Sequence, residues 1–306
     1  MAHGNPSKLV TEARNPLTDD LDLRSIDDIV DLMNNQDRVV VEAIGREREK
    51  IGQAVQLITT SMQNGGRLFY VGAGTSGRLG MLDAAECPPT FSTDPDLVQG
   101  IIAGGPIALI QAVEGAEDSP SEGASDIIVY EVNHRDVVVG IAASGTTLYV
   151  HGALQAAKKI GATTILLACN PVSRREGNHI DLAITPIVGP EIISGSTRLK
   201  AGTATKMVLN MLSTITMIKL GKVYGNLMVD VKISNQKLRR RAIDIIKQVT
   251  SLDDHDAAAL LDASGGKVKT AIVMALRDIQ SDEADALLAH HKGYVRAVIN
   301  AKSVSQ

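Results

Sequence analysis

The apolar residues of this chain follow two alternating patterns. Five short runs are continuously apolar and rich in Val and Ile, and stretches between them, such as 148–160, space their apolar residues as an amphipathic helix does. A strand of a parallel sheet is apolar throughout because helices cover both faces of the sheet. The pattern therefore predicts an α/β fold with a parallel sheet between helices. The predicted strands are 67–71, 98–103, 136–143, 163–168 and 182–188.

The residues ahead of the first strand predict helices preceded by a polar segment. Residues 25–64 carry apolar side chains at helical spacing, and the glycines at 65 and 66 end that stretch, as glycine does after a helix. Residues 1–23 are polar and are interrupted by Pro6 and Pro16. We therefore expect an extended arm there, without the apolar stretch of a signal peptide.

The composition changes to charged helices after Asn226. The predicted helices are 242–249, 254–263 and 268–276, and Asp254 is placed to cap the second. A basic run within 232–241 would suit an anion, but a solvated helix face is the more common reason for such a run. We expect an arm with helices over 1–56, the sheet domain over 57–225 and a small helical bundle over 226–306.

Composition and charge exclude several classes of partner. The net charge is −4, the pI is about 6.0, and aromatic residues make up 2% of the chain. The chain therefore lacks both a general basic field for nucleic acid or anionic lipid and the aromatic platforms that stack on single strands. Cys87 and Cys169 form no CxxC pair, so neither a zinc cage nor a disulfide framework is expected, and His134 and His151 are expected to be surface or structural residues. With no run of about 18 apolar residues, we expect a cytoplasmic protein without a membrane span.

A glycine loop follows the first predicted strand. Residues 72–77 satisfy GxGxxG, the fingerprint of dinucleotide binding. That fingerprint also needs an acidic residue near the end of the second strand, and Ile101–Gly105 offers none, so NAD or FAD is not expected. Thr75 and Ser76 suit a phosphate monoester instead, because glycine N–H groups, hydroxyls and the helix dipole all favour an anion there. Taken alone, each hydroxyl could equally be a helix cap.

A second loop of the same kind ends the third predicted strand and opens the next helix. Ligands of open α/β sheets lie at the carboxyl ends of strands near a switch in strand order, so two such turns favour one shared phosphate site over two unrelated helix caps. The expected phosphate-binding residues are Gly74, Thr75, Ser76, Gly77, Ser144, Gly145, Thr146 and Thr147.

This pair of loops resembles the sugar isomerase (SIS) domain, whose members bind sugar phosphates through such Ser/Thr loops. The resemblance implies a five-stranded parallel sheet flanked by helices. By position, Ser76, Ser144, Thr146 and Thr147 match the hydroxyls that bind phosphate in that family. The resemblance also implies a homodimer, because SIS proteins usually share their active sites between subunits.

Two acidic segments are candidates for catalysis. Glu86 lies in the helix that starts at the glycine loop, just before Pro88–Pro89, which we expect to end that helix. It would lie about 15 Å from the start of a straight helix, too far for one sugar unless the substrate lies between subunits. Glu114, Glu117 and Asp118 cluster after the second strand. A solvated turn also explains that cluster, which lacks the Asp-x-Asp spacing of a metal site.

Five strings of the chain, in order and with compatible spacing, resemble those of the N-acetylmuramic acid 6-phosphate etherases. They are 11–15, 72–80, 82–91, 113–118 and 195–206. The resemblance implies that Glu86 is the proton donor and Glu117 the second catalytic glutamate, with a phosphorylated amino sugar as substrate. It also implies cleavage of the D-lactyl ether with no metal and no cofactor.

The segment after the fifth strand is a further candidate for substrate binding. Glu191, Ser194 and Lys200 are expected to contact the sugar or the lactate carboxylate, and a polar loop with an ordinary helix cap is the alternative. Two other functions stay open from the residues alone. A non-catalytic sugar-phosphate regulator of the glucokinase regulatory protein type would carry similar loops, and a sugar-phosphate isomerase also removes a C2 proton. The five strings favour the etherase.

Overall fold

The chain divides into two units in the computed structural model, which describes residues 9–172, 178–233 and 235–301. The first unit holds the residues up to Ala85 together with Asp96–Ser213. The second holds Glu86–Pro95 together with the residues from Thr214 onward. Among the described ranges, no helix combines the length and the apolar character needed to cross a bilayer.

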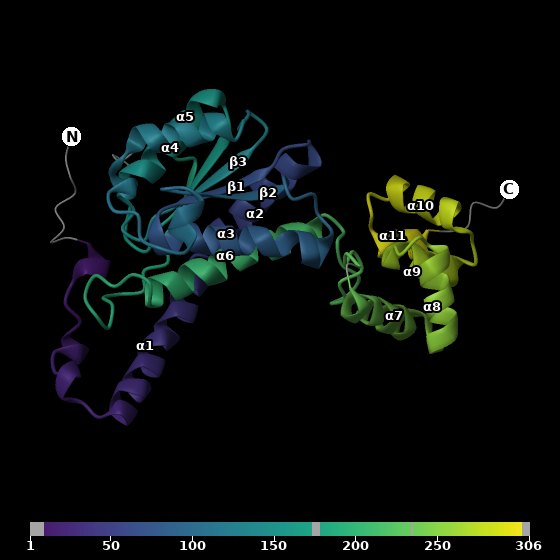
Figure 1. Ribbon diagram of the computed structural model, residues 1–306, viewed down its shortest axis with the longest axis horizontal. Helices are drawn as coiled ribbons and strands as arrows, with labels where there is room; N and C mark the ends of the chain where they lie inside the picture. The colour runs from purple at the N-terminus through teal and green to yellow at the C-terminus, as the bar shows by residue number, and fades with distance from the viewer. Residues whose placement is uncertain (1–8, 173–177, 234, 302–306) are drawn as a thin grey trace. The chain divides into compact units, whose positions relative to one another are not determined.

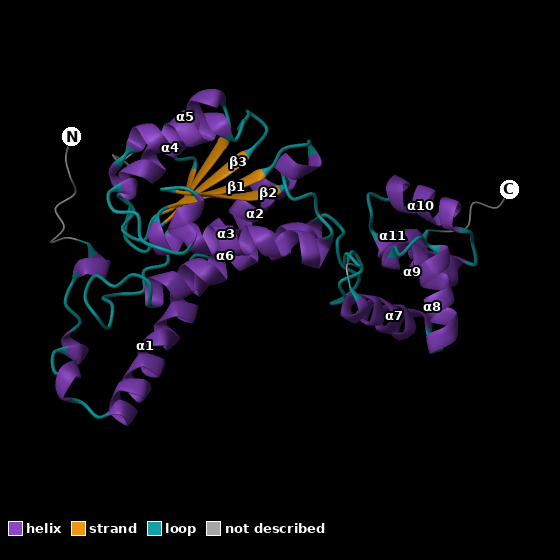
Figure 2. Ribbon diagram, in the orientation of Figure 1, coloured by secondary structure: helices purple, strands orange, loops and turns teal. Residues whose placement is uncertain are grey.

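The first unit is built on a five-stranded parallel sheet with the strand order β2-β1-β3-β4-β5 (Figure 2). All five predicted strands are present, and the α/β prediction is confirmed. β1 and β3 are buried along their whole length because helices cover both faces of the sheet. The strands are β1 Leu68–Gly72, β2 Val98–Ile102, β3 Val137–Ile141, β4 Thr163–Leu167 and β5 Leu182–Ile184.

Helices form a layer on each face of this sheet (Figure 1). The two helices α4 and α5 pack on one face, where Gly123 and Gly152 let them approach closely, since a Cβ on either would lie 2.0 Å from a carbonyl oxygen of the other segment. α2, α3 and α6 lie on the opposite face. The helices of this unit are α1 Ile26–Arg46, α2 Arg48–Gln63, α3 Gly74–Phe91, α4 Pro120–Val129, α5 Leu148–Ile160 and α6 Lys200–Lys219, of which α3 and α6 continue into the second unit.

The prediction that two prolines end α3 is wrong. α3 runs to Phe91 with Pro88 and Pro89 inside it. A proline has no N–H and cannot bond the carbonyl four residues earlier, but the helix resumes because the Ser92 N–H donates to the Pro88 carbonyl at 3.0 Å. Ser92, the first residue after the helix, has a φ of 50°, in the left-handed region where many helices end.

The N-terminal segment is not the extended arm that the sequence suggests. Residues 1–8 of that predicted arm lie outside the described residues, but the rest forms three 3-10 helices, η2 Val10–Glu12, η3 Pro16–Thr18 and η4 Leu21–Leu23. Thr11 and Asn15 are buried, at 0% and 4% exposure. Asn15 Nδ2 donates to the Pro190 carbonyl at 3.4 Å, beyond β5. The segment is therefore fixed by polar contacts that its local sequence does not reveal.

The second unit is a helical bundle around its own apolar core. Its helices are α7 Gln236–Thr250, α8 Asp254–Ala263, α9 Val268–Arg277, α10 Ser281–His290 and α11 Val295–Asn300. The predicted helices at 254–263 and 268–276 are confirmed, while α7 begins six residues earlier than expected and α10 and α11 were not predicted. Asp254 is not the cap of α8: Asp253 accepts the Asp256 N–H at 2.9 Å, and Asp254 pairs with Arg240 at 2.6 Å instead.

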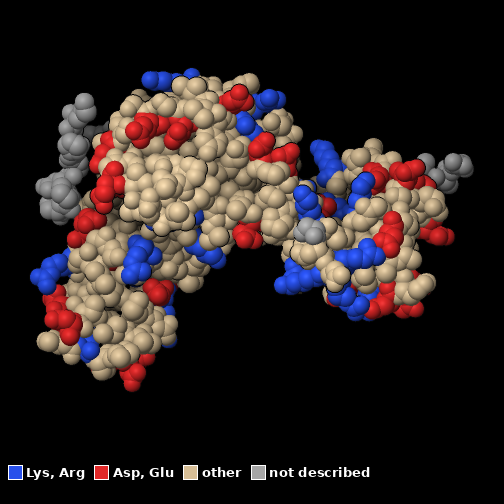
Figure 3. Space-filling model, viewed as in Figure 1, with Lys and Arg blue, Asp and Glu red and all other residues tan. Residues whose placement is uncertain are grey.

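The basic run before and within α7 forms a charged, solvated surface. Arg239 donates to both carboxylate oxygens of Asp262 at 2.7 and 2.9 Å. Figure 3 shows Lys and Arg side chains interspersed with Asp and Glu over this unit. Arg240 pairs with Asp244 and Asp254 in the same way, so the charges of these two arginines are balanced locally, as expected for an exposed helix face.

Candidate functional site

The strand order creates a switch point between β1 and β3. The chain leaves β1 towards β2 on one side and returns to β3 on the other side of β1. Gly72 and Ile141 are register partners, so the two strands end level with each other. The loops that follow them diverge to different helices, and this is the position where open α/β sheets bind ligands.

The loop after β1 is a tight strand-to-helix turn. A Cβ on Gly77 would lie 2.7 Å from the Gly72 carbonyl oxygen, and a Cβ on Gly72 would lie 2.7 Å from the Gly77 nitrogen. α3 begins at Gly74, so Thr75 and Ser76 lie within its first turn rather than ahead of it. Backbone N–H groups of a first turn have no partner within the helix. The turn therefore offers both backbone and hydroxyl donors at the edge of the sheet.

The loop after β3 brings two donors to the hydroxyl of Ser144. Ser144 Oγ accepts the Thr146 N–H at 3.1 Å and the Thr146 hydroxyl at 3.0 Å. A serine hydroxyl has two lone pairs and one proton, so both acceptor positions are filled and the proton remains to be donated. Thr147 occupies the N-cap position of α5 without capping it through its side chain. The simple capping alternative therefore fails for Thr147, and its side chain leaves the first N–H groups of α5 uncapped in the described part of the chain.

Both carbonyls that flank Ser144 are held by side chains from outside the loop. Asn170 Nδ2 donates to the Ala143 carbonyl at 2.9 Å. On the other side, His151 Nε2 lies 2.7 Å from the Gly145 carbonyl, and His151 Nδ1 lies 2.9 Å from Nε2 of His179. Burial, and then the neighbouring His151, lowers the pKa of His179. His151 thus has a structural role, as predicted, but its partner is the candidate phosphate loop.

The third candidate segment supplies a helix cap. The carboxylate of Glu191 is fully buried and accepts the N–H groups of Lys200 at 3.0 Å and Ala201 at 2.9 Å, at the start of α6. Burial raises the pKa of Glu191 despite these hydrogen bonds. Lys200 is 2% exposed and donates to Gln36 Oε1 at 3.0 Å. Ser194 is exposed. Substrate contacts by these three residues stay a prediction.

The two candidate glutamates are both exposed. Glu86 lies more than three turns along α3, and belongs to the residues grouped with the second unit. Glu117 lies in a short 3-10 helix, η6 Ala116–Asp118, in the first unit. Glu114, just ahead of that helix, is equally exposed. The described chain therefore places each carboxylate where water reaches it.

Close relatives decide the family. The chain is 52% identical over 293 residues to "N-acetylmuramic acid 6-phosphate etherase" of Crocosphaera subtropica, which covers 96% of each chain. It is 49% identical over 294 residues to "N-acetylmuramic acid 6-phosphate etherase 2" of Vibrio parahaemolyticus, which covers 96% of this chain and 98% of the relative. This chain belongs to the N-acetylmuramic acid 6-phosphate etherase family.

Other comparisons concern parts of this etherase-family chain. Residues 50–158 match the glucokinase regulatory protein N-terminal SIS domain, and residues 225–264 match the C-terminal lid domain of glucokinase regulatory protein. A phosphosugar isomerase from Bacteroides fragilis, described as putative, superposes with a TM-score of 0.47 at 19% identity, over 71% of this chain and 96% of its own. The phosphoheptose isomerase of Neisseria gonorrhoeae superposes with a TM-score of 0.46 at 16% identity, over 62% and 97%.

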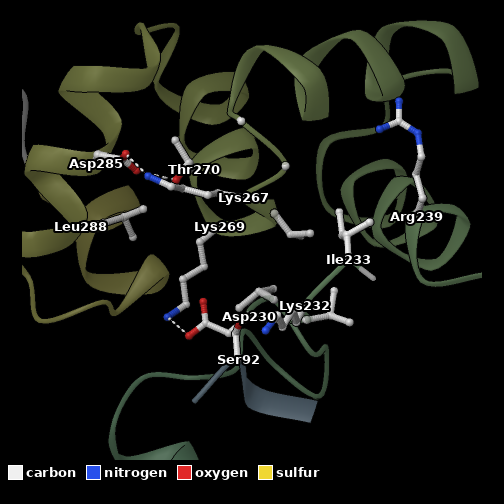
Figure 4. A pocket seen from close by; sticks show the side chains of 15 residues that line it. Ser92, Asp230, Lys232, Ile233, Arg239, Lys267, Lys269, Thr270, Asp285 and Leu288 are labelled. Carbon is white, nitrogen blue, oxygen red and sulfur yellow. Dashed lines mark hydrogen bonds and ion pairs between the residues drawn. The ribbon is translucent and has the colours of Figure 1, made fainter. Parts of the chain in front are cut away.

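The second unit of this family member contains a pocket of about 530 Å³ beside the start of α9 (Figure 4). Lys269 pairs with Asp230 at 2.7 Å, and Lys267 pairs with Asp285 at 2.7 Å. Burial lowers the pKa of Lys269. Carboxylates in the same wall already balance these two ammonium groups. The pocket is therefore a weaker candidate for a phosphate site than the two hydroxyl loops.

Two kinds of alternative ligand find little support in the described residues. The ligand atoms of Asp253, His255 and Asp256 lie within 4.8 Å of one another, but all three residues are exposed and Asp253 already caps α8. For a dinucleotide, the residues directly after β2 are Ala103 and two glycines. They provide no carboxylate for a ribose in that position.

The sequence did not point to the residues that support the etherase family's hydroxyl loop. Asn170 and Thr11 are fully buried and hydrogen-bonded to each other at 2.8 Å, although 159 residues separate them. Thr11 lies in one of the five family strings, but a string does not show which residue its side chain contacts. The sequence therefore contained Thr11 in a family string without indicating that it binds Asn170.

Proposed function

We propose that this chain cleaves the D-lactyl ether of N-acetylmuramic acid 6-phosphate with water, giving N-acetylglucosamine 6-phosphate and D-lactate. The observation that carries the proposal is the identity of about 50% over nearly the whole chain to relatives named for this activity. The hydroxyl of Ser144, whose two acceptor positions are filled by Thr146, and the second hydroxyl-bearing turn at 74–77 support a phosphorylated substrate.

The phosphoryl group would lie at the β1–β3 switch point. A phosphate oxygen is an acceptor, so it matches the free proton of Ser144, the hydroxyls of Ser76 and Thr147, and the uncapped N–H groups of α5, while the Thr146 hydroxyl is already engaged with Ser144. Two helix N-termini, those of α3 and α5, face this edge and favour an anion. No cation is needed for such a site, which fits a chain with a net charge of −4.

The chemistry follows from the poor leaving group. Direct displacement of an ether oxygen at a secondary carbon is slow, but opening the sugar ring exposes a C1 aldehyde that makes the C2 proton acidic. A carboxylate removes the C2 proton, the C3–O bond breaks, and an acid gives its proton to the departing lactate oxygen. Water then adds at C3 of the unsaturated aldehyde. Positioned acid and base groups are sufficient for every step.

We assign the proton donation to Glu86 and the second acid–base role to Glu117. A glutamate that acts as an acid near neutral pH needs a raised pKa, which burial or a nearby like charge provides. Both side chains are exposed in the single chain. We therefore propose that a second copy of the chain covers the site, so that the enzyme works as a homodimer with its active site at the subunit interface.

Helix α1 offers an apolar surface for that second copy. Ile26, Val30 and Met33 recur at helical spacing and are 81%, 59% and 37% exposed. These side chains form an apolar stripe at the N-terminal half of α1. Only contact with another surface would remove this stripe from water. In analytical ultracentrifugation the wild type should sediment at about twice 32.4 kDa, and Ile26→Asp with Val30→Asp should sediment as a monomer. A monomeric wild type would remove the dimer from the proposal.

Release of D-lactate tests the reaction itself. Incubation with N-acetylmuramic acid 6-phosphate should release one D-lactate per sugar, and the unphosphorylated sugar should be a poor substrate. Conversion of a sugar phosphate without lactate release would favour the isomerase. Binding of sugar phosphates without turnover would favour a non-catalytic sugar-phosphate regulator. The two matches to glucokinase regulatory protein domains are the reason to test for this outcome.

The glutamates are tested against a matched neighbour. Glu86→Gln and Glu117→Gln should each lower kcat by about 10²- to 10⁴-fold, as expected for loss of an acid or base group. Glu114→Gln makes the same change three residues from Glu117 at an equally exposed position and should keep full activity. Equal losses at Glu114 and Glu117, or an active Glu86→Gln variant, would contradict the assignment.

A further inference from the structure

The tautomers of the two histidines beside the Ser144 loop follow from their partners. A carbonyl oxygen only accepts hydrogen bonds, so His151 Nε2, 2.7 Å from the Gly145 carbonyl, must carry a proton. A neutral imidazole has one N–H, which leaves His151 Nδ1 as an acceptor. His179 Nε2, 2.9 Å away, must then donate to it. The two rings meet edge to face, with centroids 5.2 Å apart. The result is a directed chain from His179 through His151 to the loop.

That chain fixes one peptide plane at both of its ends. In a trans peptide the carbonyl and the following N–H point in opposite directions. The Gly145 carbonyl is held by His151, and the Thr146 N–H of the same peptide is held by Ser144 Oγ at 3.1 Å. Gly145 has a φ of 78°, a conformation that glycine adopts readily because it has no Cβ, and the two hydrogen bonds hold the peptide that follows it in one orientation. His151 therefore acts on the serine through the backbone.

We propose that His151, oriented by His179, is a positioning residue that makes Ser144 present its hydroxyl proton to the substrate phosphate. The inference rests on the proposed function, because it names support for the phosphate loop of that site. Turning the Gly145–Thr146 peptide would remove the Thr146 N–H, one of the two donors that occupy Ser144 Oγ. The Ser144 hydroxyl could then rotate, and its proton would no longer be held in position to donate to the phosphate. Hydrogen bonds in such a chain strengthen one another.

Matched substitutions at His151 test the role. His151→Leu fills similar space without a donor, whereas the amide of Gln in His151→Gln reaches about as far as Nε2 and can donate to the Gly145 carbonyl. The control His255→Leu removes an exposed histidine from the second unit. The measured quantity is the ratio of dissociation constants for N-acetylglucosamine and N-acetylglucosamine 6-phosphate, obtained by calorimetry. This ratio isolates the phosphate contribution from general effects on the sugar site.

His151→Leu should weaken binding of the 6-phosphate by about tenfold and leave binding of the unphosphorylated sugar nearly unchanged, as expected for one hydrogen bond to a charged group. His151→Gln and His255→Leu should keep the wild-type ratio. In turnover, KM should rise more than kcat falls in His151→Leu, because C6 is remote from the reacting C2 and C3 atoms. A wild-type ratio in His151→Leu, or an equal loss in His151→Gln, would overturn the proposal.

Two further results separate this inference from the proposed function. A wild-type chain with no preference for the 6-phosphate would sink the phosphate site and the inference with it, whereas a normal preference with an unchanged His151→Leu ratio sinks the inference alone. If His151→Leu does not fold, ¹⁵N spectra of wild-type histidines decide. The proposal requires His151 to be the Nε2–H tautomer and its Nε2–H resonance to shift when the 6-phosphate is added. A Nδ1–H tautomer, or a resonance that does not move, overturns it.

Discussion

Replacing Asn170 by Ala should cost the first unit a large share of its stability. The Asn170 side chain is fully buried and accepts the Val10 N–H at 2.6 Å, while its amide donates to the Thr11 hydroxyl at 2.8 Å and to the Ala143 carbonyl at 2.9 Å. A net contribution of about 1 kcal/mol per hydrogen bond, together with buried groups left without partners, gives about 3 to 5 kcal/mol. For a unit of this size that lowers Tm by about 10 °C.

The assay is urea unfolding followed by far-UV circular dichroism, because the chain has no Trp to report by fluorescence. Asn34→Ala is the control, since Asn34 is exposed on α1 and its substitution should change the free energy of unfolding by less than about 0.5 kcal/mol. Thr11→Val removes one partner of Asn170 and should cost about 1 to 2 kcal/mol. The double variant should cost less than the sum of the two, because both changes remove the same bond. Strict additivity, or a loss below 1 kcal/mol for Asn170→Ala, would refute the reasoning.

Three other predictions follow from the packing and the pKa directions. Gly77→Ala should destabilise the fold by about 1 to 3 kcal/mol and weaken phosphate binding, because its Cβ would lie 2.6 Å from Ile102 Cγ1 and 2.7 Å from the Gly72 carbonyl oxygen. The control Gly52→Ala, with open space around its Cβ in α2, should stabilise by up to about 1 kcal/mol; chemical denaturation measures both. Burial, and then Glu191, raises the pKa of Cys169 to about 12, so iodoacetamide at pH 8 should leave this thiol unmodified until the chain unfolds, and labelling in the native state would contradict this. Burial, and then His151, lowers the pKa of His179, so the unfolded chain binds the proton more readily and stability should fall as the pH drops below about 6.5. His179→Gln should flatten that pH dependence, and an unaltered slope would count against it.

The sheet and its two loops could be predicted because their signals are local. The strands are short apolar runs, and the ends of β1 and β3 are each marked by Gly, Ser or Thr within the next few residues. Once the strands are parallel, the loops after β1 and β3 must share one edge. The positions of Ser76 and Ser144 therefore followed from pattern alone.

The features that the sequence did not predict depend on partners far along the chain. The polar residues of 9–15 look like a solvated arm until Asn170 is placed beside Thr11. α11 has only six residues, and a helix that short is stabilised mainly by tertiary packing rather than by its own propensity. In α3 a local rule about proline gave the wrong end, because the bonds on both sides of the prolines hold the helix together.

The long separation between Val10 and Asn170 also has a consequence for how the protein is made. A ribosome must add 160 residues after Val10 before the side chain that binds its N–H exists, which takes roughly 10 to 30 s at ordinary rates of translation. During that time the Thr11 hydroxyl lacks its Asn170 partner. This edge of the sheet is thus finished only after Asn170 has been made, when the earlier segment around Val10 returns to bind the loop that follows β4.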